Sequence, residues 1–419
     1  MNSVLHGTVE DLEYLLSPRT IRARAQEIFE HAAQGRTHFA LHLDRLPEVA
    51  MLVSEVTLAH YPQLDIPYHS RWNHFRVGGV DRNGQLNAHL ARLSSNERVK
   101  AKLDLVIVSV LLDAGAGTQW QYTERHSGWK GGRSEGLAVA SWNMFTEGHF
   151  SSRKNEPLCV DAEGLEKLNI ETLAHAFQVS EQNPLVGLEG RFSLLKALAK
   201  ALRKDPELFG ASDPRPGALL DYFQAGAIFH HSEVQGVQIL RTLQRGLGSI
   251  WPGRITLQTP QGVFNLGDVW HYSPLGEKLS RSSLVPFHKL SQWLSYSLIE
   301  PLMEAGLHIT EVQELTGLAE YRNGGLMLDG GLLQLRNPKL QAQSHQPSSE
   351  LIIEWRALTI ALLDQLAEPV RKRLGDAAKD FPLAKILEGG TWWAGRQLAN
   401  HQRRDGGSPL KLDSDGTVF

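Results

Sequence analysis

Cysteine is almost absent from this chain of 419 residues, whose single thiol is Cys159. One cysteine cannot form a disulfide within the chain, and it leaves no cysteine-based zinc cluster. An excess of either charge is also missing, since 43 lysines and arginines face 46 aspartates and glutamates and leave a net charge of −3. No long block of one sign interrupts this balance. We therefore expect neither a nucleic-acid partner nor attraction to an anionic membrane.

Long apolar runs are missing as well. The longest covers residues 105–112, contains Ser109 and lies between Asp104 and Asp113. A membrane-spanning helix needs about 20 apolar residues, so this run is expected to be a buried helix instead. The first residues lack a basic stretch followed by an apolar one, which argues against a secretory signal. We predict a cytoplasmic protein that does not associate with membranes.

No tract rich in glycine and serine or in proline divides the chain, and its 42% hydrophobic and 21% charged residues are typical of a globular protein. We expect one continuous body over residues 1–419. The alternative is a subdivision into an N-terminal helical part, 1–209, and a helical part that bears the site, 210–393. Residues 394–419 are polar and contain several glycines, which predicts a flexible tail.

Helical periodicity dominates the chain. Apolar residues recur at helical spacing in the segments 19–33, 43–61, 189–203 and 350–366. Residues 254–264 instead place isoleucine, leucine and valine among threonines around a Pro-Gln-Gly turn, which predicts a small β-hairpin. The pattern indicates a mainly α protein with a little sheet.

Reactive polar residues gather between Asp268 and Asp329, next to aromatic residues and glycines. This combination is what an enclosed site for a polar ligand requires. Each such residue taken alone is more often a helix cap, an ion pair or a core residue. The residues that single out the stretch are Asp268, His288, Lys289, Glu320, Arg322 and Asp329.

Signatures of several other chemistries are missing. The chain has no P-loop, no G-x-S-x-G and no H-E-x-x-H, and the glycines of residues 115–117 lack the third glycine of a dinucleotide loop. His230 and His231 stand near Glu233, but adjacent histidines point in different directions, so no metal site is predicted. A mechanism based on carboxylates remains. Its candidates are Asp113, Asp268, Glu320, Asp329 and Glu354.

Five motifs stand in order along the chain: Leu112-Asp-Ala-Gly-Ala-Gly117, Arg133-Ser-Glu-Gly136, Phe287-His-Lys-Leu-Ser-Gln292, Glu320-Tyr-Arg-Asn-Gly-Gly325 and Glu354-Trp-Arg-Ala357. With them, nearly the whole chain resembles the family of fungal and bacterial proteins of unknown function called uracil catabolism protein four. This resemblance implies a place in a pyrimidine breakdown route that passes through a ribosylated urea. The bond between urea and ribose must be cut in such a route.

A more distant resemblance is to the queuosine salvage hydrolases, which are N-glycosidases. It is carried by Asp113 with Trp120, by Asp268-Val-Trp270, by the motif from Phe287 to Gln292, and by Glu354-Trp-Arg-Ala357. The resemblance implies a helical body of the DNA-glycosylase-like, helix-hairpin-helix related kind. No metal or organic cofactor is implied.

The third of these motifs departs from the salvage enzymes, because Phe287 occupies the position of their aspartate. A second register places the same motif on Glu320-Tyr-Arg322 and restores an acid. The sequence leaves both registers open. Ala116, Gly117 and Gln119 replace the asparagine and aromatic residues that follow the first aspartate, which argues for a departing group that is smaller or more polar than a deazaguanine.

The resemblance and the carboxylates together predict an N-ribosyl hydrolase acting on ribosylurea, its 5'-phosphate or a related riboside, with other enzymes of uracil breakdown as its partners. The alternative is a binding or scaffold protein without activity, which Phe287 favours. A DNA-repair glycosylase would need a basic surface, which the charge balance does not predict. The predicted catalytic residues are Asp268 and Glu320, and the predicted substrate-binding residues are Asp113, Trp120, His288, Lys289, Arg322, Asp329 and Glu354.

Overall fold

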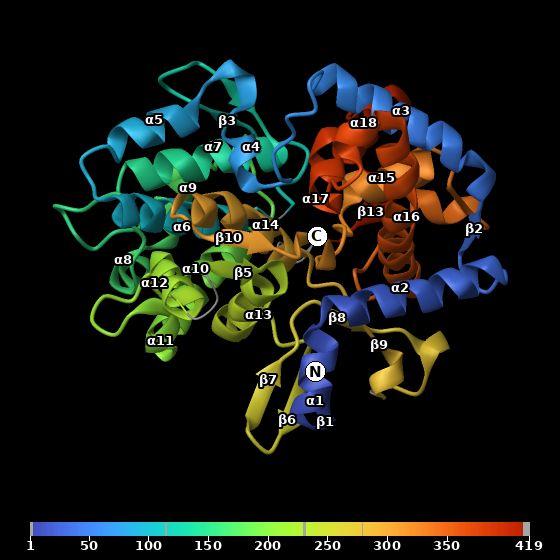
Figure 1. Ribbon diagram of the computed structural model, residues 1–419, viewed down its shortest axis with the longest axis horizontal. Coiled ribbons are helices and arrows are strands. Elements are labelled where there is room, and N and C mark those ends of the chain that lie inside the picture. Colours follow the sequence, from blue (N-terminus) through green and yellow to red (C-terminus); the bar gives the residue numbers. More distant parts are fainter. Residues whose placement is uncertain (1–2, 114, 229–231, 279, 414–419) are drawn as a thin grey trace.

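Helices dominate the architecture, and the strands form one three-stranded and several two-stranded sheets (Figure 1). The computed structural model describes residues 3–113, 115–228, 232–278 and 280–413. The mainly helical fold with little sheet that the sequence predicts is confirmed. None of the described helices combines the length and apolar character needed to cross a membrane.

Helices from the middle of the chain lie together on the left in Figure 1. They are α4 (Arg71–His74), α5 (Arg82–His89), α6 (Ser95–Leu111), α7 (Arg133–Thr146), α8 (Ala162–Lys167), α9 (Ile170–Ala176), α10 (Leu188–Lys204), α11 (Pro206–Phe209), α12 (Leu219–Ala227) and α13 (Gly236–Leu247). The helix α14 (Lys289–Glu304) packs against α6 and α13.

Helices from both ends of the chain lie together on the right in Figure 1. They are α2 (Pro18–Ala33), α3 (Leu46–His60), α15 (Tyr321–Asp329), α16 (Glu350–Leu374), α17 (Leu383–Ile386) and α18 (Trp392–Gln402). The helix α16 packs against both α2 and α3. Buried apolar residues of both groups belong to one hydrophobic core, which includes Val108, Leu195, Leu358 and Leu410.

The predicted helices are present where the apolar periodicity places them. The segments 19–33, 43–61, 105–112 and 189–203 correspond to α2, α3, the end of α6, and α10. The helix α16 extends eight residues beyond the predicted end, from 366 to 374, because Ala367 and Val370 continue its buried stripe. The start of α2 follows the usual chemistry, since Ser17 accepts a hydrogen bond from the Arg19 backbone N–H and Pro18 occupies the first turn.

The predicted hairpin is confirmed. Strands β6 (Ile255–Thr259) and β7 (Gly262–Asn265) pair in antiparallel fashion, with Thr259 opposite Gly262. Strand β1 (Ser3–His6) adds to β6 in parallel, and this sheet stands with α1 (Val9–Leu16) at the bottom of Figure 1. The two-stranded pairs are β2 (Phe39–Leu41) with β11 (Leu333–Leu335), β3 (Tyr122–Thr123) with β4 (Lys130–Gly131), β5 (Glu233–Gln235) with β10 (His308–Thr310), β8 (Val269–His271) with β9 (Leu284–Pro286), and β12 (Ser344–His345) with β13 (Lys411–Leu412).

The described part of the segment 394–419, for which the sequence predicts a flexible tail, contains most of α18 and the strand β13 (Lys411–Leu412). Of the described part, α18 packs closely on α15, and β13 pairs with β12. A Cβ atom at Gly395 would lie 2.2 Å from the carbonyl oxygen of Arg322, so a glycine is needed for this close approach. Polar composition alone does not reveal such packing.

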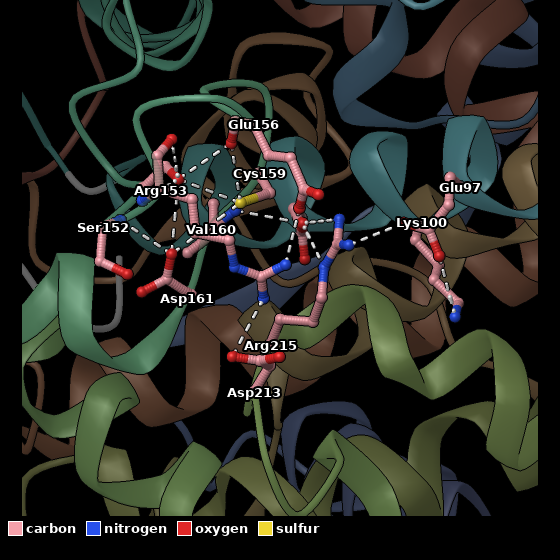
Figure 2. A network of polar contacts seen from close by, with 12 residues as sticks. Glu97, Lys100, Ser152, Arg153, Glu156, Cys159, Val160, Asp161, Asp213 and Arg215 are labelled. Atoms are coloured by element: carbon pink, nitrogen blue, oxygen red, sulfur yellow. Dashed lines mark hydrogen bonds and ion pairs between the residues drawn. The ribbon is translucent and has the colours of Figure 1, made fainter. Parts of the chain in front are cut away.

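A buried network of ion pairs and hydrogen bonds joins α6 to the segments that carry Val160 and Arg215. Asp104 of α6 is 0% exposed and accepts hydrogen bonds from the Arg215 guanidinium at 2.6 and 3.0 Å, from the Val160 backbone N–H at 3.1 Å and from the Gly217 backbone N–H at 2.6 Å. Arg215 and Val160 are seen in Figure 2 with the buried thiol of Cys159. Because a buried charge is tolerated only when it is paired, this network sets the position of α6 and of Asp113, two residues beyond its end.

Candidate functional site

A cavity of about 570 Å³ lies where the ends of several elements meet, a size that suits a small molecule. Its walls come from the loop before α4, the end of α4, the segment after α6, the starts of α7, α14, α15 and α18, and the segment that follows α18. The polar and aromatic residues that line it include His69, His74, Asp113, Arg133, Ser134, Lys289, Trp293, Glu320, Tyr321, Trp392, Arg403, Asp405 and Lys411.

Asp113 lies at the cavity as an ion pair with a fully buried arginine. Its Oδ1 is 3.1 Å from Arg71 Nη1, and its Oδ2 accepts a hydrogen bond of 2.8 Å from the Ser134 hydroxyl. Burial acts against the charge of this carboxylate, but the attraction of Arg71 outweighs it and lowers the pKa of Asp113. Asp113 is therefore a carboxylate at neutral pH.

His74 is a neutral ring beside this ion pair. Burial, together with the charge of Arg71, lowers the pKa of His74 to about 4. Its Nδ1 is 3.2 Å from Arg71 Nη1, and a guanidinium only donates hydrogen bonds. We therefore assign Nδ1 as an acceptor and place the proton on Nε2. A neutral His74 thus offers a hydrogen-bond donor to the cavity.

Lys289 is the buried cation of the site, at the first position of α14. It is 9% exposed, and its ammonium lies 5.5 Å from the centre of the Trp293 ring. Burial lowers the pKa of Lys289, and the charges of Asp113 and Glu320 oppose that shift. A lysine with a lowered pKa transfers its proton more readily than a free one.

Glu320 caps the start of α15 and lines the cavity. Its Oε2 accepts a hydrogen bond from the Arg322 backbone N–H and its Oε1 one from the Asn323 backbone N–H, both at 2.6 Å. Burial raises the pKa of Glu320, against the effect of these two hydrogen bonds. The carboxylate is thus held rigidly by the helix that it caps, in a largely water-excluded position.

Asp268, the other predicted catalytic residue, is not among the residues that line the cavity. Its two oxygens accept from Arg356 at 2.8 and 2.7 Å, from Trp270 Nε1 at 2.6 Å and from the Lys289 backbone N–H at 3.1 Å. Burial opposes its charge, but Arg356 lowers the pKa of Asp268 strongly. These contacts hold the start of α14, and of the two predicted carboxylates only Glu320 faces the cavity.

Phe287, which stands in the aspartate position of the first register, is 2% exposed and packs against the Arg356 guanidinium, 4.0 Å from the centre of its ring. It does not line the cavity. The second register, which uses Glu320, is the one that places an acid at the cavity.

Three of the predicted binding residues make hydrogen bonds within the protein and do not line the cavity. The Trp120 indole donates to the carbonyl oxygen of Phe177 at 2.9 Å. His288 Nε2 lies 2.9 Å from the carbonyl oxygen of Leu15. Glu354 accepts from the Tyr272 hydroxyl at 2.8 Å and also contacts His38, so it joins α16 to its neighbours.

Two other predicted binding residues, Arg322 and Asp329, bind the segment that follows α18, part of which lines the cavity. Arg322 donates to the carbonyl oxygen of Gly406 at 2.9 Å, and Asp329 pairs with Arg403, whose Nη1 lies 2.9 Å from Oδ1. Arg133 donates to the same carbonyl of Gly406 at 2.8 Å. Asp113, Lys289 and Glu320 are thus the predicted residues that the structure brings together at the cavity.

Sequence reasoning missed the two histidines of the cavity and their partners. The segment from Arg71 to Arg76 was a visible signal, because it reads as a polar and aromatic turn that would suit either a ligand or a loop closure. His69 contacts Glu388, which is 319 positions away, so no local spacing relates them. His230 and His231 lie outside the described residues. Within the described ranges, no group of three or more histidine, cysteine, aspartate or glutamate residues is arranged to hold a metal ion.

Comparison with known proteins identifies the family of this chain. The chain belongs to the family described as "Protein of unknown function (DUF1688)", which it matches over residues 14–419. It is 41% identical over 425 residues to "Protein urg3" of Schizosaccharomyces pombe, covering 98% of this chain and 100% of that protein. It is 36% identical over 441 residues to "Uracil catabolism protein 4" of Lachancea kluyveri, covering 97% of this chain and 99% of that protein. The family resemblance carried by the five motifs is confirmed.

Proposed function

We propose that this protein is an N-ribosyl hydrolase of uracil breakdown. Its substrate is ribosylurea, the 5'-phosphate of ribosylurea or a related riboside, and its products are urea or a base and ribose or ribose phosphate. The observation that carries the proposal is the buried carboxylate of Glu320, held at a cavity of about 570 Å³ together with Lys289 and Asp113. The name of the Lachancea kluyveri relative supports the place in uracil catabolism.

The proposed reaction passes through an oxocarbenium-like sugar. As the C–N bond breaks, positive charge develops on the ribose, and a fixed carboxylate in a site of low dielectric constant stabilises it. The bond electrons stay on the departing nitrogen, which takes up a proton. We assign Glu320 to the first task and the Lys289 ammonium to the second, while the Nε2–H of His74 hydrogen-bonds to the departing group.

The DNA-glycosylase-like relationship implied by the queuosine salvage enzymes belongs to this proposal, as does a cytoplasmic location. A scaffold that only binds an intermediate is the second candidate, and Phe287 in the position of a catalytic aspartate favours it. The acid at Glu320 favours the hydrolase, because a scaffold does not need a buried carboxylate beside a buried ammonium.

The deciding experiment incubates the purified protein with N-ribosylurea and, separately, with its 5'-phosphate. Free urea and free reducing sugar are measured over time. Equal release of both from either compound supports the hydrolase. Saturable binding by calorimetry without release supports the scaffold instead, and the absence of both binding and release contradicts both candidates.

A further inference from the structure

His69 forms part of the cavity wall and is hydrogen-bonded to Glu388, and neither residue takes part in the steps assigned to Glu320, Lys289 and His74. Nδ1 of His69 is 2.8 Å from Oε2 of Glu388, and the Tyr61 hydroxyl donates to Oε1 at 3.2 Å. His69 is 3% exposed and Glu388 is 5% exposed. The backbone N–H of His69 donates to the carbonyl oxygen of Ala384 at 3.1 Å, so both the ring and its backbone are held.

Glu388 reaches His69 through an uncommon backbone geometry. It lies in a π-helical turn, Leu387–Thr391, between α17 and α18. Two glycines follow Glu388 and let this turn approach α3. A Cβ at Gly390 would lie 2.6 Å from Val53 Cγ1 and 2.5 Å from Thr57 Oγ1. Turns of this kind are rare and are frequently found at functional sites, which favours a role for the pair beyond a packing contact.

The partner of His69 sets the position of its proton. A carboxylate only accepts hydrogen bonds, so the neutral ring carries its proton on Nδ1 and leaves the lone pair of Nε2 free. Nε2 has no hydrogen-bond partner among the residues that the structure describes, and His69 lines the cavity. His74, on the same wall, has the opposite arrangement, with Nδ1 accepting from Arg71. One ring therefore offers an acceptor to the cavity and the other a donor.

We infer that His69, oriented by Glu388, is the base that takes a proton from the attacking water. This inference rests on the proposed hydrolase function. The water oxygen forms the new bond to the anomeric carbon as the C–N bond breaks, and one water proton moves to Nε2 of His69. The departing nitrogen keeps the bond electrons and receives a proton from Lys289. Proton exchange through solvent then returns His69 to the neutral and Lys289 to the charged form, so no net proton is consumed.

Both titratable and aromatic groups surround the His69 ring. The titratable groups near it are Glu388, which also accepts from Tyr61, and Glu320 and His74. The rings of Trp293 and Trp392, each 6.4 Å away between centroids, are not charged. Only the neutral ring can accept the proton of the attacking water, through the free lone pair of Nε2.

The test measures urea release from N-ribosylurea, or from its 5'-phosphate if only that compound is cleaved. We expect His69→Gln to lower kcat about 10² to 10³-fold with a small change in KM. Imidazole added to the His69→Ala variant should restore part of the lost rate. Glu388→Gln keeps a hydrogen-bond acceptor but removes the charge that stabilises the ring as it takes up the water proton, so kcat should fall by a smaller factor, again with a small change in KM.

The chain offers a matched control in a second pair of the same geometry, His38 with Glu354, where Nδ1 and Oε2 are 2.9 Å apart. Neither residue lines the cavity. His38→Gln should retain the kcat and KM of the parent. The inference is overturned if the parent releases urea while either His69→Gln or Glu388→Gln keeps the parent's kcat. A parent that releases no urea overturns the hydrolase proposal as well, which separates the two failures.

Discussion

Replacing Glu320 by glutamine tests the central assignment, because it removes the charge with little change in size. The oxocarbenium-like state needs a negative charge nearby. One unit charge at about 5 Å, in a medium of effective dielectric constant about 20, contributes about 3 kcal/mol. Since about 1.4 kcal/mol corresponds to a tenfold change in rate, we expect kcat to fall by about a hundredfold or more, with substrate affinity changed much less.

The substitution also has a structural cost that the contacts make explicit. Both oxygens of Glu320 accept backbone N–H groups, of Arg322 and Asn323, and glutamine has only one oxygen. Its amide NH2 would face one of these donors, so the cap of α15 loses one hydrogen bond. We expect the free energy of unfolding to fall by about 1–2 kcal/mol. A loss of stability alone must therefore be separated from a loss of catalysis.

Asp161 supplies the control for that structural cost. It caps α8, and its two oxygens accept from the backbone N–H groups of Gly164 at 2.7 Å and Ser152 at 2.8 Å. Asp161→Asn should lower the free energy of unfolding, measured by urea denaturation, to a similar extent and leave kcat unchanged. Urea release is measured for both variants and for the parent. A Glu320→Gln variant that turns over at the parent's rate would refute the role of this carboxylate, and a collapse seen only in Asp268→Asn would move the role to Asp268.

Two further predictions concern stability. Burial lowers the pKa of His74 from 6.5 to about 4, so the unfolded chain binds more protons than the folded one between these pH values. The free energy of unfolding should therefore decrease as the pH falls through that window. Chemical denaturation of the parent should show this decrease, up to about 3 kcal/mol. The decrease should be smaller in His74→Gln, whose side chain does not titrate. Equal decreases in both proteins would contradict this prediction. Asp104→Ala leaves the buried Arg215 without this partner and should lower the free energy of unfolding by about 3–5 kcal/mol, whereas a change below about 1 kcal/mol in thermal or urea melts would show that the network contributes little.

The sequence alone contained the local part of the architecture. Helices such as α2, α10 and α16 follow from apolar residues repeating every three to four positions, because that spacing places them on one face whatever the rest of the chain does. The hairpin of β6 and β7 follows from its turn. The motif Glu320-Tyr-Arg322 was recognisable as the register that supplies an acid, and the five motifs together identified the family.

The tertiary structure decided which of these polar residues meet. Asp268 and Glu320 are equivalent candidates in the sequence, yet Arg356, 88 positions from Asp268, occupies both oxygens of one, while the other faces the cavity. The pairing of His69 with Glu388 depends in the same way on the close approach of a π-helical turn to α3. Periodicity acts over a few residues, whereas hydrogen bonds and ion pairs between distant segments exist only once the core has packed. The sequence therefore determined the helices and the family, and packing determined the site.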